Sequence, residues 1–330
     1  MRIFIAGATG ALGRRLASLL IDAGHHVTGT TRSVGKAGRL RSMGVEPVVL
    51  DALDRDAVMA AVGAAQPEVV VHQLTALSAP IDMRRFDQSF AMTNRLRTAG
   101  TDHLLAAAQA AGARRFIAQS YTGWLNERTG GPVKTEDDPI DPNPAATTRE
   151  TVAALHHVED ATIAASGIDA LALRYGNFYG AGTSLGIGGD VLEMVRARRL
   201  PVVGGGTGVW SFIHIDDAAQ ATAVAVERGA PGLYNIVDDD PAPVHEWLPH
   251  LAEAIGAKPP LRLPAWLVRP LLGEHGVSLM TAVRGSSNAK ARRELGWQPD
   301  HRSWRQGFRD GLGATPQERR AAREQAPPQH

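Results

Sequence analysis

The chain has 330 residues, 44% of them hydrophobic and 21% charged, and its formal net charge is +1. This composition is typical of a soluble globular protein, and the small net charge gives no reason to expect nucleic acid or an anionic membrane as a partner. The lack of cysteine excludes disulfides, thiolate nucleophiles and thiolate metal sites. No apolar run approaches the roughly 20 residues of a membrane span, and no signal-peptide pattern is present. We therefore expect a cytoplasmic protein without a metal site.

The first thirteen residues carry the most specific motif. An apolar run from Ile3 to Ala6 leads into Gly7, Gly10 and Gly13, and a helical pattern follows from Arg14 to Ala23. Glycine suits these places because a sharp turn, a close pyrophosphate and tight packing of helix on strand leave no room for a Cβ. The free amides at the helix start would then face the phosphates. The motif predicts a dinucleotide site with these contacts: Gly7, Thr9, Gly10, Ala11, Leu12 and Gly13.

The tip of the second expected strand, His26 to Thr31, distinguishes two cofactors. Arg32 follows that strand directly, with Lys36 close behind. At this place an acid binds the two ribose hydroxyls of NAD, whereas an arginine suits the 2′-phosphate of NADP. We therefore predict NADP (NADPH) as the cofactor. The alternative for Arg32 is a solvated arginine in a loop.

Strands and helices then alternate along the chain. The expected strands cover residues 46–50, 69–74 and 115–120, and the expected helices cover 37–43, 55–64 and 88–111. Such alternation predicts an α/β fold with a doubly wound parallel sheet (Rossmann), whose ligands gather at the carboxyl ends of the strands. We expect five residues at these ends to line the cofactor trough: Asp51, Ala52, Leu74, Thr75 and Ala76.

Several segments in order resemble the extended short-chain dehydrogenase/reductase family, the NAD(P)-dependent epimerase/dehydratase group. The resemblance covers nearly the whole chain. It implies that Tyr175, Asn177 and Phe178 pack near the nicotinamide. The matching segments are the three glycines, Asp51-x-x-Asp54, Asn94 with Gly100-Thr101 and Leu104-Leu105, the strand ending at Ser120, and residues 173–180, 212–219, 233–237 and 288–297.

The resemblance also implies the domain organisation. Residues 1–180 would form the dinucleotide-binding domain, completed by about 207–240, and the chain would rejoin the sheet at 210–215. Residues 181–206 and 241–314 would form a smaller C-terminal substrate lobe. Residues 315–330 lack apolar spacing, so we expect a poorly ordered tail. The helices at 88–111 and 149–165 would pair two chains into a homodimer.

The family's acid/base apparatus is only partly present. The resemblance implies a Ser or Thr at the end of the fifth strand and a Tyr-x-x-x-Lys pair on the next helix, in which the lysine lowers the pKa of the tyrosine. Ser120 fills the first place and would hold the substrate oxygen. The pair would fall on Thr151 and Leu155 or, in a shifted register, on Val152 and His156. The residues four places before the only lysines are Arg32, Gly130, Ala254 and Ser286, so the sequence contains no Tyr-x-x-x-Lys.

Two residues are candidates to replace the missing pair. Tyr121 follows Ser120, and neighbouring residues at a strand end point in opposite directions, so one of the two should face the cofactor. The other candidate is His156 or its neighbour His157, because a neutral imidazole has a suitable pKa without help from lysine. The alternative for His156 is an exposed or dimer-contact helix face. Trp124, in the long loop from 121 to 148, is a candidate wall of the substrate pocket.

These features favour an NADP-dependent oxidoreductase with a non-standard acid/base centre, acting on a small carbonyl or hydroxyl compound. Two alternatives remain open. One is a non-redox isomerase, cyclase or lyase on the same fold, with the cofactor structural or absent. The other is an NADP-sensing regulator without turnover. The missing pair supports both alternatives, whereas a complete substrate lobe argues against the sensor, which needs no enclosed pocket.

Overall fold

The computed structural model describes residues 1–77 and 81–313 of the chain. A parallel sheet of seven strands forms its centre, in the order β12-β7-β5-β4-β1-β2-β3. The chain winds away from β1 in both directions, which opens a crevice at the carboxyl ends of the strands. The strands are β1 (Arg2–Ala6), β2 (His26–Thr31), β3 (Glu46–Val49), β4 (Val69–His72), β5 (Arg115–Tyr121), β7 (Asp169–Tyr175) and β12 (Gly232–Ile236).

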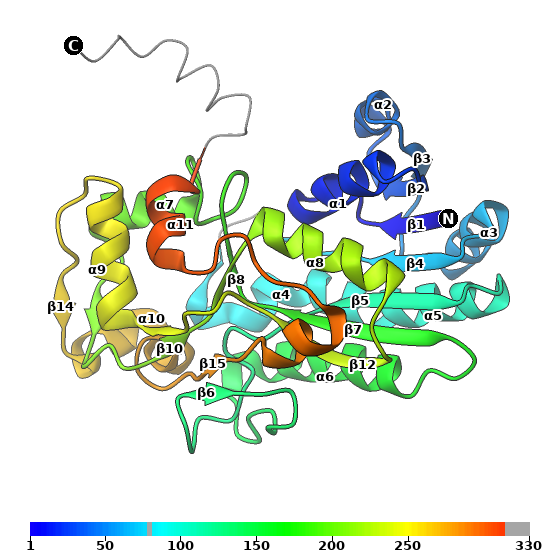
Figure 1. Ribbon diagram of the computed structural model, residues 1–330. Helices are drawn as coiled ribbons and strands as arrows, with labels where there is room; N and C mark the ends of the chain where they lie inside the picture. Colours follow the sequence, from blue (N-terminus) through cyan, green and yellow to red (C-terminus); the bar gives the residue numbers. More distant parts are fainter. Residues whose placement is uncertain (78–80, 314–330) are drawn as a thin grey trace, which may run out of the picture.

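Helices cover both faces of this sheet (Figure 1). Alternate residues of a strand face opposite sides, so Ile5 shares a core with Leu16 and Ala218, whereas Phe4 shares one with Val58. Both faces are therefore buried, and the doubly wound α/β fold expected from the sequence is confirmed. The helices of this layer are α1 (Ala11–Asp22), α2 (Val34–Ser42), α3 (Arg55–Ala65), α6 (Arg149–Ile163) and α8 (Ile215–Glu227).

The long helix expected at 88–111 is present but contains an irregular turn. It consists of α4 (Phe86–Arg95), a π-helical turn (Leu96–Gly100) and α5 (Thr101–Ala110). Such single π turns often occur at functional sites, because the extra residue in the turn changes which side chains face inward. Here the turn contains the buried Arg97.

A smaller lobe with its own core lies beside the sheet, at the carboxyl ends of its strands (Figure 1). Aromatic side chains dominate this core: Phe212, Trp247, Trp304 and Phe308. The elements of the lobe are α7 (Asp190–Arg196), β9 (Val202–Val203), α9 (Val244–Ala254), β14 (Arg262–Leu263), α10 (Ala265–Thr281, with a kink at Gly273) and α11 (Trp304–Asp310).

The segment by which the chain returns from the smaller lobe to the main sheet differs from the expectation. Residues 210–215 were expected to rejoin it, but they do not. β10 (Val209–Trp210) pairs with β13 (Ala242–Pro243), and β11 (Phe212–His214) pairs with β8 (Asn177–Tyr179). Among the described strands, β12 is the one that completes the main sheet on that edge. The short strands β6 (Val133–Lys134) and β15 (Gly285–Ser286) form another pair.

Two further expectations from the sequence concern the tail and membrane-spanning helices. The predicted tail at 315–330 lies outside the described residues. Among the residues that the structure describes, no helix combines the length and apolarity needed to cross a bilayer.

Candidate functional site

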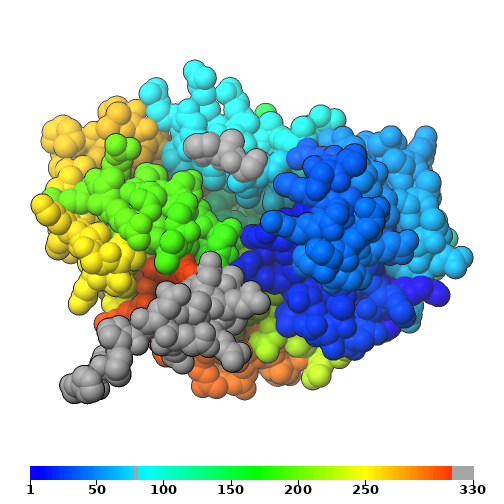
Figure 2. All heavy atoms as spheres, turned by 90° about the horizontal axis from the view of Figure 1, so that it is seen from above, coloured from blue at the N-terminus to red at the C-terminus, as the bar shows by residue number. Residues whose placement is uncertain are grey.

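The carboxyl ends of the sheet strands face the smaller lobe, with the amino-terminal segment on one side (Figure 1). Figure 2 shows a recess on this side of the molecule, between the blue amino-terminal segment and the green segment near residues 180–200. Doubly wound sheets bind their ligands at this place.

The glycine loop after β1 has the geometry of a phosphate cradle. Gly7 has a φ of 95°, and a Cβ there would lie 2.6 Å from the carbonyl oxygen of Gln73. A Cβ on Gly13 would collide with the backbone of Gly7. Gly10 precedes α1, and no side chain caps the helix there. The first amides of α1 are therefore free to bind a pyrophosphate, with the half-buried Thr9 and Ala11 beside them. Leu12 is buried in the core behind the loop.

A basic cavity adjoins this loop. It has a volume of about 420 Å³ and is lined by Thr9, Arg14, Gly35, Lys36, Arg39 and Leu40. Burial and then the charges of Arg15 and Arg39 lower the pKa of Arg14. Arg14, Lys36 and Arg39 make no ion pair with any residue in the described parts of the chain. Uncompensated cations around a cavity can hold a phosphate.

Arg32, the residue from which we predicted the 2′-phosphate contact, does not line this cavity. Its side chain is exposed just beyond β2. Arg14 and Arg39 were missed by the sequence reasoning. Arg14 is the fourth residue of α1, and Arg39 lies in the last turn of α2. Basic residues on the helices that follow β1 and β2 are therefore the signal that could have found them.

The residues expected along the trough have different environments. Asp51 is exposed and its carboxylate accepts the amide hydrogen of Leu53 at 3.0 Å, which shapes the turn before α3. Ala52 is buried in the core. The half-buried residues Leu74, Thr75 and Ala76 follow β4 next to the glycine loop, where they remain candidates for cofactor contact.

Ser120 does not face the crevice. Its hydroxyl donates a 2.6 Å hydrogen bond to Oε1 of Glu159, which also accepts bonds of 2.7 and 2.6 Å from Arg174. All three side chains are buried between the sheet and α6. Ser120 and Arg174 are paired across β5 and β7 and so point to the same face. Ser120 is therefore part of a buried hydrogen-bond network, and the contact with a substrate oxygen expected for it stays a prediction.

Tyr121 points the other way, as alternation along β5 requires. It is half-buried, and its hydroxyl donates a 2.6 Å hydrogen bond to Oδ1 of Asn177. Burial raises the pKa of Tyr121, and the nearby Arg97 partly opposes this change. Phe178 is also half-buried. Tyr121, Asn177 and Phe178 therefore lie where the strands end.

Tyr175, expected beside the nicotinamide, is instead fully buried. Its hydroxyl accepts a 3.1 Å hydrogen bond from the amide of Gln73 and shares one of 2.7 Å with the hydroxyl of Thr222. Tyr175 therefore faces α8 from within the sheet, and the cofactor contact expected for it stays a prediction.

The helix that should carry the tyrosine and lysine presents other residues. Thr151 is fully buried, donates a 2.6 Å hydrogen bond to Asp87 and accepts one of 3.0 Å from Asn94. Leu155 is also fully buried. His156, the histidine candidate, is half-buried and makes no hydrogen bond within the described residues. No described contact joins it to Tyr121.

A group missed by the sequence reasoning lies beside Tyr121. Arg97 is only 7% exposed, and its guanidinium carbon lies 5.8 Å from the centre of the Phe90 ring. The inward side of the long helix, with Phe90, Arg97, Thr101 and Leu104 spaced by seven, four and three residues, is the pattern that could have revealed it.

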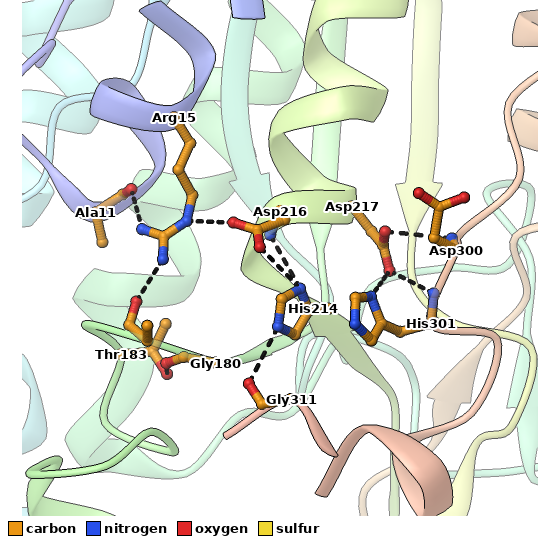
Figure 3. Close-up of polar contacts among 11 residues, drawn as sticks. Ala11, Arg15, Gly180, Thr183, His214, Asp216, Asp217, Asp300, His301 and Gly311 are labelled. Atoms are coloured by element: carbon orange, nitrogen blue, oxygen red, sulfur yellow. Dashed lines mark hydrogen bonds and ion pairs between the residues drawn. The ribbon is translucent and has the colours of Figure 1, made fainter. Parts of the chain in front are cut away.

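A cluster of His214, Asp217 and His301 brings three potential metal ligands within 4.8 Å of one another (Figure 3). One His214 nitrogen bonds the carbonyl of Gly311 at 3.2 Å, and the other accepts the amide hydrogen of Asp216. His301 is bonded to Asp217 at 3.0 Å. With these nitrogens engaged, the cluster ties the start of α8 to the residues on either side of α11.

Comparison with known proteins identifies the family of this chain. A model of the NAD-dependent epimerase/dehydratase family matches residues 3–237. The chain belongs to this family. It is therefore an enzyme of the NAD(P)-dependent reductase and epimerase type that acts on a small molecule.

Relatives within and around the family differ in their reactions. The chain is 47% identical over 320 residues to a 3-diazoavenalumate denitrifying reductase from a Streptomyces species, covering 95% of this chain and 99% of the relative. It is 30% identical to the 2-alkyl-3-oxoalkanoate reductase of Stenotrophomonas maltophilia, covering 78% and 76%. A UDP-glucose 4-epimerase structure from Thermotoga maritima has a TM-score of 0.74 at 22% identity, covering 94% and 97%, which shows the shared fold.

Proposed function

We propose that the protein is an NADPH-dependent reductase whose reaction needs no proton from the helix that serves this purpose elsewhere in the family. The observation that carries this proposal is the burial of Thr151 and Leu155. Both are fully buried on α6, and the Thr151 hydroxyl is already bonded to Asp87 and Asn94. In neither register does the Tyr-x-x-x-Lys pair exist, so α6 offers no phenol to donate a proton.

The choice of NADPH rests on the basic cavity next to the glycine loop. The free amides of α1 suit the pyrophosphate, and Arg14, Lys36 and Arg39 are grouped where the 2′-phosphate would extend from the adenosine ribose. An arginine binds phosphate oxygens with two parallel hydrogen bonds, which NADH could not form for lack of that group. When bound, the cofactor would supply a hydride.

An aryl diazonium ion is the substrate class that fits such a site. Transfer of a hydride to the ring carbon forms a C–H bond while the C–N bond breaks, and dinitrogen leaves with the bonding pair. The aryl diazonium and NADPH thus become an arene, dinitrogen and NADP⁺, and no proton is consumed. The relative that is 47% identical bears the name of a denitrifying reductase acting on a diazo compound, which supports this class.

Carbonyl reduction is the second candidate, and Tyr121 favours it. Reduction of a ketone forms an alkoxide that must be protonated, and the half-buried Tyr121 hydroxyl at the end of β5 is a possible donor. The relative that is 30% identical is named for the reduction of an oxoalkanoate. Asn177 holds this hydroxyl, however, so the proton is less available than in a Tyr-Lys pair.

The test uses the purified full chain with NADPH deuterated at the transferring C4 position. We expect 4-carboxybenzenediazonium to be converted to benzoate that carries deuterium, with release of dinitrogen, as measured by mass spectrometry. The enzyme-free reaction with the same components gives the background. Oxidation of NADPH with acetophenone-type ketones but not with the diazonium ion would favour the second candidate. Absence of turnover above background with both classes would refute the proposal.

A further inference from the structure

Arg97 is a buried cation for which the described residues provide no counter-charge. It lies in the π turn between α4 and α5 and is 7% exposed, and its Nη1 atom has no hydrogen-bond partner in the described parts of the chain. Within residues 1–77 and 81–313, no carboxylate forms an ion pair with it. Other buried arginines in this protein are paired: Arg174 with Glu159, and Arg115 with Asp169 and with backbone carbonyls.

The titratable groups around Arg97 do not supply the missing charge. Burial lowers the pKa of His72 to about 4, and both its nitrogens are bonded, one at 3.2 Å to the Leu96 carbonyl and one at 3.2 Å to the Leu74 amide. Burial raises the pKa of Tyr121 above its usual value. Both groups are therefore neutral at pH 7. Burial lowers the pKa of Arg97 to about 10, which leaves the guanidinium charged.

A buried charge is costly unless a partner of opposite sign and matching hydrogen bonds accompany it. The guanidinium group presents a planar fork of donors that matches the two oxygens of a carboxylate. A ligand that brings a carboxylate would therefore complete the environment of Arg97.

The walls beside Arg97 are aromatic. Phe90, which lies below its guanidinium, stacks on Phe86 with ring centres 4.4 Å apart. Trp124 meets Phe86 at 5.5 Å and His275 of α10 at 5.0 Å, and Tyr121 lies 5.9 Å from Trp124. The smaller lobe thus contributes to the same group of rings as the sheet domain. Flat rings of this kind favour a flat, aromatic ligand.

We propose that Arg97 binds the carboxylate of an aromatic acid, whose ring contacts the aromatic side chains around Phe86, Phe90 and Trp124. This inference rests on the proposed function, for which it specifies the substrate class as an aryl carboxylate. The cofactor has its own places for phosphate at the glycine loop and the basic cavity. Arg97 lies instead among His72 and Tyr121, at the ends of β4 and β5, on the far side of β4 from β2.

The test measures binding by calorimetry, with NADP⁺ present and with cinnamate and its uncharged amide, cinnamamide, as probes. We expect the wild-type chain to bind the acid more tightly than the amide. Arg97→Met should weaken acid binding by about 10- to 100-fold, because a hydrogen-bonded charge pair is lost, and should leave amide binding unchanged. Arg97→Lys, which keeps the charge without the fork, should have an intermediate effect. Arg95→Met is the matched control, since Arg95 is exposed on the same helix.

Thermal unfolding without ligand separates this role from a structural one. Removal of an unpaired buried charge should leave the melting temperature of Arg97→Met unchanged or raise it. A lower melting temperature of Arg97→Met together with an unchanged preference for the acid would overturn the proposal. Equal binding of the two probes by the wild-type chain would also overturn it, and so would a failure of the wild-type chain to bind cinnamate. If cinnamate binds through Arg97 but NADPH is never oxidised, the reductase proposal fails and the anion site stands. If NADPH is oxidised with uncharged substrates only, the reductase proposal stands and the carboxylate site at Arg97 fails.

Discussion

The Tyr121 hydroxyl donates its hydrogen bond to Oδ1 of Asn177 at 2.6 Å. The orientation of the Asn177 amide is set by its other end, where Nδ2 donates to the carbonyl oxygen of Ser211 at 3.0 Å. The phenol proton is therefore directed at Asn177, and Tyr121 must break this bond before it can protonate a substrate. This arrangement suits a hydride transfer that requires no proton.

Replacement of Tyr121 distinguishes the two candidate reactions. If the substrate is an aryl diazonium ion, Tyr121→Phe should change kcat by less than about 3-fold, because no proton is transferred, whereas loss of a general acid lowers the rate about 10²- to 10⁴-fold. The measurement is the rate of NADPH oxidation with each substrate class. Asn177→Ala is the companion variant, since it frees the phenol. A rise in ketone reduction in Asn177→Ala would show that the bond to Asn177 restrains the proton.

The basic cavity predicts cofactor preference. Arg39→Ala and Lys36→Ala should each raise the Kd for NADPH by about 10- to 100-fold through loss of a charged hydrogen bond, with no change for NADH. Fluorescence titration of both cofactors gives the values. Arg32→Ala tests the contact that we predicted from the sequence, and a small effect is expected because Arg32 lies outside the cavity. A larger effect at Arg32 than at Arg39 would place the 2′-phosphate at the tip of β2 instead.

The network of Ser120, Glu159 and Arg174 should govern stability. Glu159→Ala leaves the Arg174 guanidinium buried without its partner and should lower the free energy of unfolding by about 3–5 kcal/mol. Ser120→Ala removes one neutral donor and should cost about 1 kcal/mol, with little change in kcat. Denaturant unfolding and NADPH oxidation measure the two effects. A loss of kcat without a loss of stability in Ser120→Ala would support the catalytic role expected for Ser120 from the sequence.

His301 predicts a dependence of stability on pH. Its hydrogen bond to Asp217 raises the pKa of His301, although burial opposes the change. A raised pKa in the folded state contributes stability that is fully present below the unfolded value, about 6.5, and is lost as pH rises through the folded pKa. The wild-type chain should therefore exceed His301→Asn in free energy of unfolding by more at about pH 6 than at about pH 8.5.

The control for this prediction is His26→Asn, whose side chain is exposed at the start of β2. Its difference from the wild-type chain should not vary with pH in the same way. The stacked neighbour His214, at 3.8 Å, does not add to the gain at low pH, because burial lowers its pKa. A difference for His301→Asn that grows with rising pH would contradict the assignment of its partner.

The sequence by itself determined the features that depend on neighbouring residues. Gly7, Gly10 and Gly13 identified the phosphate loop, because a turn of this kind excludes a Cβ whatever surrounds it. The alternation of apolar strands and helices gave the doubly wound sheet, with β2 at the residues predicted. The missing Tyr-x-x-x-Lys was also visible, since no fold can supply a lysine at that spacing.

Only the tertiary structure decided which way side chains face and what accompanies them. Ser120 and Tyr121 are adjacent, but the first bonds the buried Glu159 and the second bonds Asn177, because β5 turns one of its faces towards α6. Tyr175 turned out to be a core residue because Gln73 and Thr222, far away in sequence, hold its hydroxyl. The helical spacing of Arg97 indicates that it faces inward, but only the packing shows that no carboxylate among the described residues pairs with it. The partners of a buried side chain come from distant segments, and local patterns do not specify which segments these are.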